Sequence, residues 1–141
     1  TIGYILFASY WGMLGYFFFK KKLSIYSLAA LAALIFFFLP TRVHERYLYP
    51  AIIFLIISAA QLKSRMLFIL SIILSFIHFL NLYYVYVYYN EFYLKMPKLL
   101  YNSILYNLLD NQGKSLSLLS TAIFILISII IIKLNYEHRK T

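Results

Sequence analysis

Cysteine is absent from the 141 residues, and acidic side chains are scarce, with 4 Asp and Glu against 13 Lys and Arg. Without cysteine the chain cannot form disulfides, use a thiolate nucleophile or bind a metal through sulfur. Charged residues make up 12% of the sequence, about half of their share in a soluble domain. A soluble domain of this length needs a polar surface that so few charges cannot supply. The composition therefore excludes an ordinary soluble fold.

Apolar residues fill most of the chain, with 64% hydrophobic, 21% aromatic and a mean hydropathy of +0.82. Because a bilayer core is crossed by about 20 apolar helical residues, five segments qualify as spans: 2–19, 23–39, 47–62, 66–89 and 116–134. We predict an all-α fold, a polytopic transmembrane helical bundle of about five spans, with residues 1–141 forming a single membrane domain. The third segment has only 13 residues from Pro50 to its end, so it recruits residues 47–49 or stops short.

The stretch between the fourth and fifth segments has a helical pattern of its own. Pro97 suits the first turn of a helix, and apolar and polar residues then alternate with helical spacing as far as Asp110. Residues 111–113, Asn-Gln-Gly, read as a helix stop. The pattern predicts a short interfacial helix over 97–110, lying on the outer membrane surface.

Basic residues gather at the ends of the apolar segments, where they orient membrane helices and indicate no nucleic-acid partner. With five spans, one face receives eight of them, Lys20, Lys21, Lys22, Lys63, Arg65, Lys133, Arg139 and Lys140, and the other receives five, Arg42, Arg46, Lys95, Lys98 and Lys114. The positive-inside rule makes the first face cytoplasmic. We expect a cytoplasmic C-terminus and an extracytoplasmic 40–50 segment. The abundance of Ile, Lys, Asn, Tyr and Phe points to a bacterial cytoplasmic membrane.

The segment 40–50, PTRVHERYLYP, concentrates charge between two apolar segments, and such charge needs water, headgroups or a partner. Pro50 would start a helix whose N-terminal donors and positive dipole end point outward. Arg42 and Arg46 beside that end would form an anion site suited to phosphate. His44 could donate a hydrogen bond or a proton, and Glu45 could hold an arginine in position. The simpler alternative is anchoring, in which the arginines reach lipid phosphates.

The run from Phe38 to Ala51, FLPTRVHERYLYPA, resembles the HERY signature of bacterial GT-C-type membrane glycosyltransferases, especially the group related to GPI mannosyltransferases. The resemblance covers about a tenth of the chain. It implies an enzyme that moves a sugar from a polyprenyl-phosphate donor to an acceptor outside the cytoplasm, with inversion at the anomeric carbon. It also implies that Arg42, His44 and Arg46 bind the donor phosphate and that Glu45 orients them. No metal and no cofactor are expected.

The family's general base is an acidic residue in an early outer loop, which this chain lacks. Glu91 and Asp110 are the only other outer carboxylates, and position alone assigns neither as the base. Since the chain starts at Thr1 within an apolar segment, we expect it to be the C-terminal part of a longer polypeptide or to need a partner chain that carries the base. Its other expected partners are the lipid-linked sugar donor and membrane lipids.

Two further interpretations stay open: a non-catalytic membrane subunit or scaffold that binds lipid headgroups, and a fragment of a transporter for lipid-linked sugars. Transporters place polar sites near the midplane of the membrane, where this chain has only His78, followed by Asn81. No acidic residue accompanies His78 within a predicted span. We therefore interpret it as a neutral imidazole that hydrogen-bonds to a neighbouring helix.

Overall fold

Helices account for nearly all of the chain that the structure describes. The computed structural model describes residues 2–20, 22–39 and 45–138, and no strand occurs within these ranges. The predicted all-α class is confirmed. In chain order the elements are α1 (Ile2–Phe19), α2 (Ile25–Phe38), the 3-10 helix η1 (Glu45–Leu48), α3 (Tyr49–Gln61), α4 (Arg65–Tyr86), the π-helical η2 (Val87–Tyr93) and α5 (Ser103–His138).

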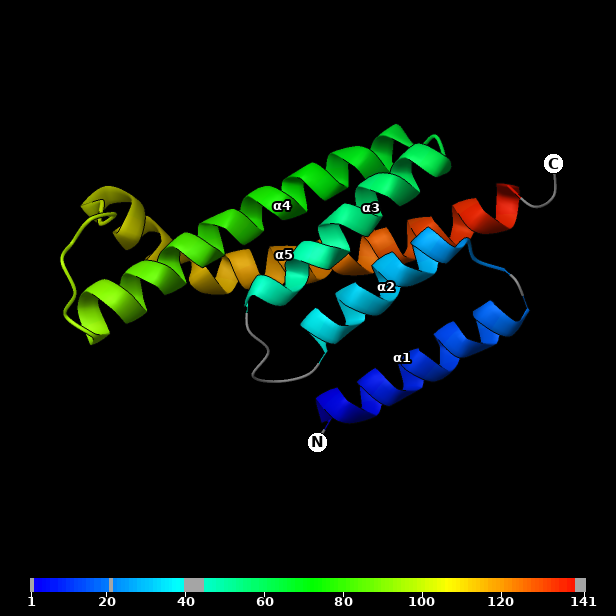
Figure 1. Ribbon diagram of the computed structural model, residues 1–141, viewed down its shortest axis with the longest axis horizontal. Helices are drawn as coiled ribbons and strands as arrows, with labels where there is room; N and C mark the ends of the chain where they lie inside the picture. Colours follow the sequence, from blue (N-terminus) through cyan, green and yellow to red (C-terminus); the bar gives the residue numbers. More distant parts are fainter. Residues whose placement is uncertain (1, 21, 40–44, 139–141) are drawn as a thin grey trace.

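The α-helices run in alternating directions, so that their connections gather at two ends of the molecule (Figure 1). One end holds the α1–α2 connection with Lys20 and Lys22, the α3–α4 turn with Lys63, and the last turns of α5 with Lys133. We call it the lysine end. The opposite end, where α2 ends and α3 begins, is the far end. Here α4 and α5 extend beyond α2 and α3 and are joined through η2.

Short polar side chains cap the N-termini of α2, α4 and α5. The hydroxyl oxygens of Ser24 and Ser64 each accept a hydrogen bond from the N–H three residues along the chain, at 3.2 Å, a role that serine favours at a helix N-terminus. Asn102 caps α5 by accepting from two backbone N–H groups at 3.1 and 3.0 Å. Pro50 lies in the first turn of α3, as predicted, where its missing N–H leaves no helical bond unmade.

The core is centred on α2, which packs against α3 along most of its length. Ala30 of α2 and Ala51 of α3 are both fully buried, and such small side chains let two helices approach closely. Around them lie the largest fully buried side chains, contributed by every α-helix: Leu14, Leu31, Leu34, Ile35, Leu55, Leu67, Leu74, Ile127 and Ile131. The α1 helix lies at the edge of this core, to which it contributes Leu14, and it packs mainly on α2 (Figure 1).

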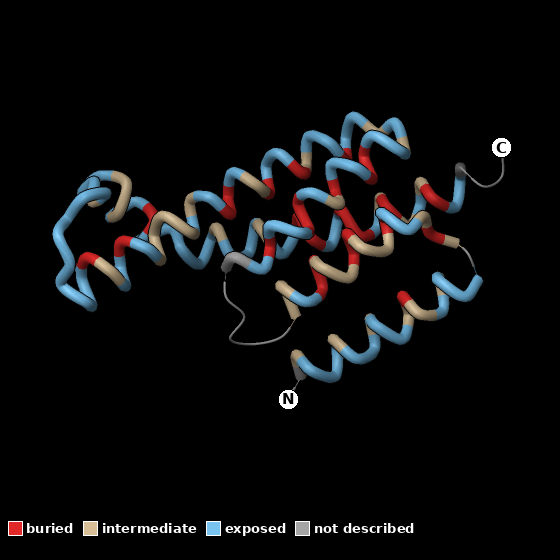
Figure 2. Tube along the Cα trace, viewed as in Figure 1, coloured by how far each residue is buried: buried red, intermediate tan, exposed pale blue. Residues whose placement is uncertain are grey.

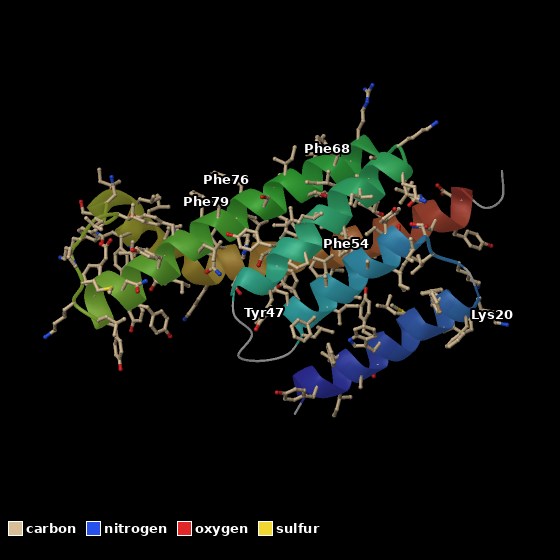
Figure 3. The ribbon with its side chains drawn as sticks, viewed as in Figure 1. Lys20, Tyr47, Phe54, Phe68, Phe76 and Phe79 are labelled. Atoms are coloured by element: carbon tan, nitrogen blue, oxygen red, sulfur yellow. The ribbon has the colours of Figure 1, made fainter. Side chains whose placement is uncertain are left out.

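Much of the chain is exposed (Figure 2), and many of the exposed side chains are large and apolar. Phe68, Phe76 and Phe79 project from the outward face of α4 (Figure 3) and are 46%, 62% and 65% exposed. Within the described residues, Arg65–Tyr93 and Ser103–Glu137 are long and apolar enough to cross a membrane. The α2 and α3 helices have 14 and 13 residues, shorter than the roughly 20 that a crossing uses. The prediction of five spans is therefore not confirmed.

The prediction of a short helix over 97–110, ending at 111–113 before a separate span, is wrong. A single helix, α5, runs for 36 residues from Ser103 to His138 and passes through Gly113 without a break. Asn102, rather than Pro97, provides its start. A glycine inside a helix costs only about 1 kcal/mol relative to alanine. That cost is small compared with the stabilisation from packing α5 along α4, so helix continuity prevails over the local stop signal.

Candidate functional site

The predicted donor-phosphate residues belong to the connection between α2 and α3 at the far end. Arg42 and His44 lie outside the residues that the structure describes. The backbone of Glu45 and Arg46 forms the first half of η1, which continues directly into α3, while their side chains lie outside the described part. Leu48, two residues after Arg46, is only 2% exposed. Through Leu48, η1 is seated against α2 and α4.

A partly open cavity of about 250 Å³ lies beside η1, lined by the end of α2, the second half of α4 and the first half of α5. Its wall combines apolar side chains with six that carry an imidazole, an amide or a hydroxyl. The lining residues are Phe37, Phe38, Leu48, Leu74, Ile77, His78, Leu80, Asn81, Tyr84, Leu109, Gly113, Leu116, Ser117, Ser120 and Thr121. Leu48 therefore connects the charged segment 42–46 with a cavity built from the two longest helices.

His78 lies on the α4 side of this cavity and is 4% exposed. Its ring meets Phe37 edge-on, with centroids 6.0 Å apart, and Tyr49 edge-on at 5.2 Å. Tyr49 is the first residue of α3 and directly follows η1. The imidazole, interpreted from the sequence as neutral and hydrogen-bonded to a neighbouring helix, is packed against Tyr49 at the end of the charged segment.

Hydroxyl groups form the α5 side of the cavity. Ser120 and Thr121 both donate to the carbonyl oxygen of Ser117, at 2.8 and 2.9 Å. Because each hydroxyl has used its proton, its oxygen faces the surroundings as a hydrogen-bond acceptor. The sequence analysis did not identify these three residues. Their spacing of three and four residues puts them on one helix face, and that spacing was the available signal.

Glu91 and Asp110, the two carboxylates predicted to lie on the outer face, do not line the cavity. Glu91 is 3% exposed in the π-helical segment, and its Oε1 accepts the backbone N–H of Leu100 at 2.8 Å. Asp110 Oδ1 accepts a hydrogen bond from the hydroxyl of Tyr84 at 2.7 Å, which ties α5 to α4. Both groups therefore support the far-end structure, and the geometry assigns neither as a general base.

Aromatic side chains of α4, η2 and α5 pack on one another at the far end. Tyr106 of α5 stacks on Tyr84 and on Phe92, with centroids 5.4 and 5.0 Å apart. The ammonium group of Lys98 lies 4.9 Å from the ring centroids of both Phe92 and Tyr101, within the range of a cation–π attraction. This aromatic cluster closes the α4–α5 hairpin beyond the cavity.

The described residues offer no cluster of three His, Asp or Glu side chains that could hold a metal ion. What the site offers instead is a cavity with a mixed polar and apolar wall, next to a segment that contains two arginines. Comparisons with protein families, with characterised proteins and with solved structures find no match to this chain.

Proposed function

We propose that this chain is a membrane module of a GT-C-type glycosyltransferase that uses a polyprenyl-phosphate-linked sugar. Arg42, His44 and Arg46 bind the donor phosphate, and Glu45 orients the arginines. The sugar occupies the cavity lined by His78 and the hydroxyl groups of α5. The HERY-like run supports the phosphate role, and the cavity beside η1 supports the sugar role.

The single observation that carries the proposal is the position of η1 on the wall of the cavity. Leu48 lines the cavity, and the backbone of Arg46 is two residues away, which is at most about 7 Å along the chain. An arginine side chain is long enough to span that distance to a phosphate at the edge of the cavity. A cavity of about 150 Å³ already holds a benzene ring, so one of about 250 Å³ has room for a single sugar ring.

In the proposed reaction the bond between the anomeric carbon and the phosphate oxygen breaks, and a bond to the acceptor oxygen forms on the opposite face. The acceptor proton goes to a general base that lies outside the residues assigned here. The leaving polyprenyl phosphate gains negative charge as the bond breaks. Arg42 and Arg46 stabilise that charge, and such placed cations are among the largest contributions to catalysis.

Direct binding tests the phosphate role without requiring the base. The purified full chain in detergent would be titrated with undecaprenyl phosphate and with undecaprenol, which lacks the phosphate, and bound lipid counted by native mass spectrometry. Losing a hydrogen bond to a charged group costs about 1.5 to 3 kcal/mol, so Arg46→Gln should weaken phosphate binding about 10- to 100-fold. Lys63→Gln at the lysine end is the matched control. Equal binding by Arg46→Gln and the parent chain would refute the phosphate role.

The sugar role is tested by filling the cavity. Gly113 lines it, and a Cβ at this position would meet no atom within 4 Å, so Gly113→Trp should occupy the space without a clash at its base. We expect weaker binding of the sugar-linked donor and unchanged binding of undecaprenyl phosphate alone. Gly15→Trp, at an equally open position in α1, is the control. Unchanged binding of the sugar-linked donor to Gly113→Trp would exclude the cavity as the sugar site.

A scaffold that merely contacts headgroups would behave differently in the same titration. It would bind phosphatidylglycerol and undecaprenyl phosphate equally at Arg46. Preference for the polyprenyl phosphate, lost in Arg46→Gln, therefore separates the enzyme module from the scaffold.

A further inference from the structure

A second hollow lies at the lysine end, between α1 and α5, away from the proposed donor site. It has a volume of about 390 Å³, within the range of small-molecule pockets. Its apolar wall includes Phe17 of α1, Leu23 of the connection, and Ile129 and Ile132 of α5. The hollow exists because α1 packs mainly on α2 and does not close against the last turns of α5. We call it the α1–α5 groove.

Two ammonium groups lie at the edge of this groove. Lys22 comes from the α1–α2 connection and Lys133 from α5. The Lys22 ammonium is 5.4 Å from the ring centroid of Tyr16. This cation–π contact positions the ammonium and leaves its N–H groups able to donate to an anion. Lys133 is 3.9 Å from Glu137, and the two side chains are 72% and 56% exposed. An ion pair this exposed is weak, so another anion, such as a lipid phosphate, can take the place of the Glu137 carboxylate beside Lys133.

We propose that the α1–α5 groove binds one anionic phospholipid of the surrounding bilayer. An acyl chain lies along Phe17, Ile129 and Ile132, and the lipid phosphate lies between Lys22 and Lys133. Basic pockets between membrane helices on the cytoplasmic side commonly take such headgroups, and the charge count of the sequence places the lysine end on that side.

The charge at the groove determines which lipid is preferred. Lys22, Lys133 and Glu137 sum to one positive charge, which complements a headgroup with one net negative charge and gives a zwitterionic headgroup no advantage. The apolar wall distinguishes a whole lipid from a free phosphate, because a free phosphate leaves the wall exposed. A partner protein helix would cover the wall but would supply no anion to the two lysines.

A bound lipid would also join the last turn of α1 to the last turns of α5, beyond the contact between the rings of Tyr10 and Phe124. A ligand that binds only the folded form stabilises that form by mass action. We therefore expect an anionic lipid to raise the melting temperature, chiefly by holding α1 against α5. This role is independent of the donor site at the far end.

The headgroup is tested with the full chain in detergent, by native mass spectrometry with phosphatidylglycerol and phosphatidylcholine of identical acyl chains. We expect about 10-fold tighter binding of phosphatidylglycerol, and loss of that preference in the double variant Lys22→Gln, Lys133→Gln. Lys63→Gln removes a charge from the same end without touching the groove and should keep the preference. Equal binding of the two lipids by the parent chain, or equal loss in Lys63→Gln, would overturn the proposal.

The acyl chain is tested by filling the groove. Ile129 lines it, whereas Ile125, one helical turn earlier and similarly exposed at 52% against 58%, does not. Ile129→Trp should weaken phosphatidylglycerol binding several-fold, and Ile125→Trp should leave it unchanged. Glycerol phosphate, which has no acyl chain, should not compete. Effective competition by glycerol phosphate, or equal effects of the two tryptophans, would show that only a surface charge attracts the lipid.

Discussion

Removing the hydroxyl of Ser27 should destabilise the bundle more than removing any comparable serine. Ser27 is fully buried in α2 near the lysine end. Its oxygen accepts from the hydroxyl of Ser24 at 2.9 Å and from the side-chain amide of Asn135 at 3.0 Å. It also lies 2.7 Å from the hydroxyl oxygen of Ser58 in α3. With both lone pairs accepting, its own proton goes to Ser58, so the group is fully satisfied.

The size of the effect follows from these three bonds. Hydrogen bonds between membrane helices average about 0.6 kcal/mol, and those in soluble proteins about 1 kcal/mol. Ser27→Ala therefore lowers the free energy of unfolding by about 2 to 3 kcal/mol. The change removes only an oxygen atom, so almost no cavity term is added. Ser58→Ala removes one of the three bonds and should cost about 1 kcal/mol.

Ser71→Ala is the matched control. Ser71 is also fully buried, but its hydroxyl donates to the carbonyl oxygen of Leu67 within α4, at 2.7 Å. That bond links no two helices, and the carbonyl keeps its helical partner when the hydroxyl is lost. We expect a change below about 0.5 kcal/mol.

Equilibrium unfolding in mixed micelles of increasing SDS content, followed by circular dichroism, measures the free energies. The double variant Ser27→Ala, Asn135→Ala completes a cycle that isolates their coupling, which we expect at about 0.5 to 2 kcal/mol. If Ser27→Ala and Ser71→Ala cost the same, the interhelical network does not stabilise the bundle and the reasoning fails.

Two other predictions concern the arrangement of the helices. Gly3→Ala should lower the melting temperature, because the added Cβ would lie 2.6 Å from the carbonyl oxygen of Leu39 and push α1 from α2. At Gly12 an added Cβ meets no atom within 4 Å, so Gly12→Ala should raise the melting temperature. Equal melting temperatures of the two variants would contradict the contact between Gly3 and Leu39. Spin labels on cysteines introduced at Ile104 and Leu126 should lie about 33 Å apart by electron spin resonance, because a straight helix rises by this length over 22 residues. A distance of about 24 Å would instead indicate a right-angle bend at Gly113.

Local patterns predicted the helical class, the alternating connections and the start of α3. Apolar runs and their basic ends are read directly along the chain, and Pro50 suits a first helical turn in any context. Helix length was harder to predict, because residues 87–93 form a π-helix after α4 and Gly113 lies within α5. Both outcomes depend on how α4 and α5 pack together, which no local window contains.

For the candidate site, too, some residues could be identified from the sequence and others only from the structure. Arg42, His44, Glu45 and Arg46 stand out because charge is rare in this sequence. The cavity wall could not be predicted, since Leu48, His78 and Ser117 come from three elements far apart in the chain. The buried bonds among Ser27, Ser58 and Asn135 were missed for the same reason.

By itself, the sequence determined that this chain is helical, where most helices begin, and which end carries the lysines, because backbone capping, hydropathy and charge act over a few residues. Only the tertiary structure decided which helices continue through weak stop signals, which polar groups meet, and where two hollows form. Those features arise from contacts between residues distant in sequence, where a small local cost is outweighed by packing along a whole helix.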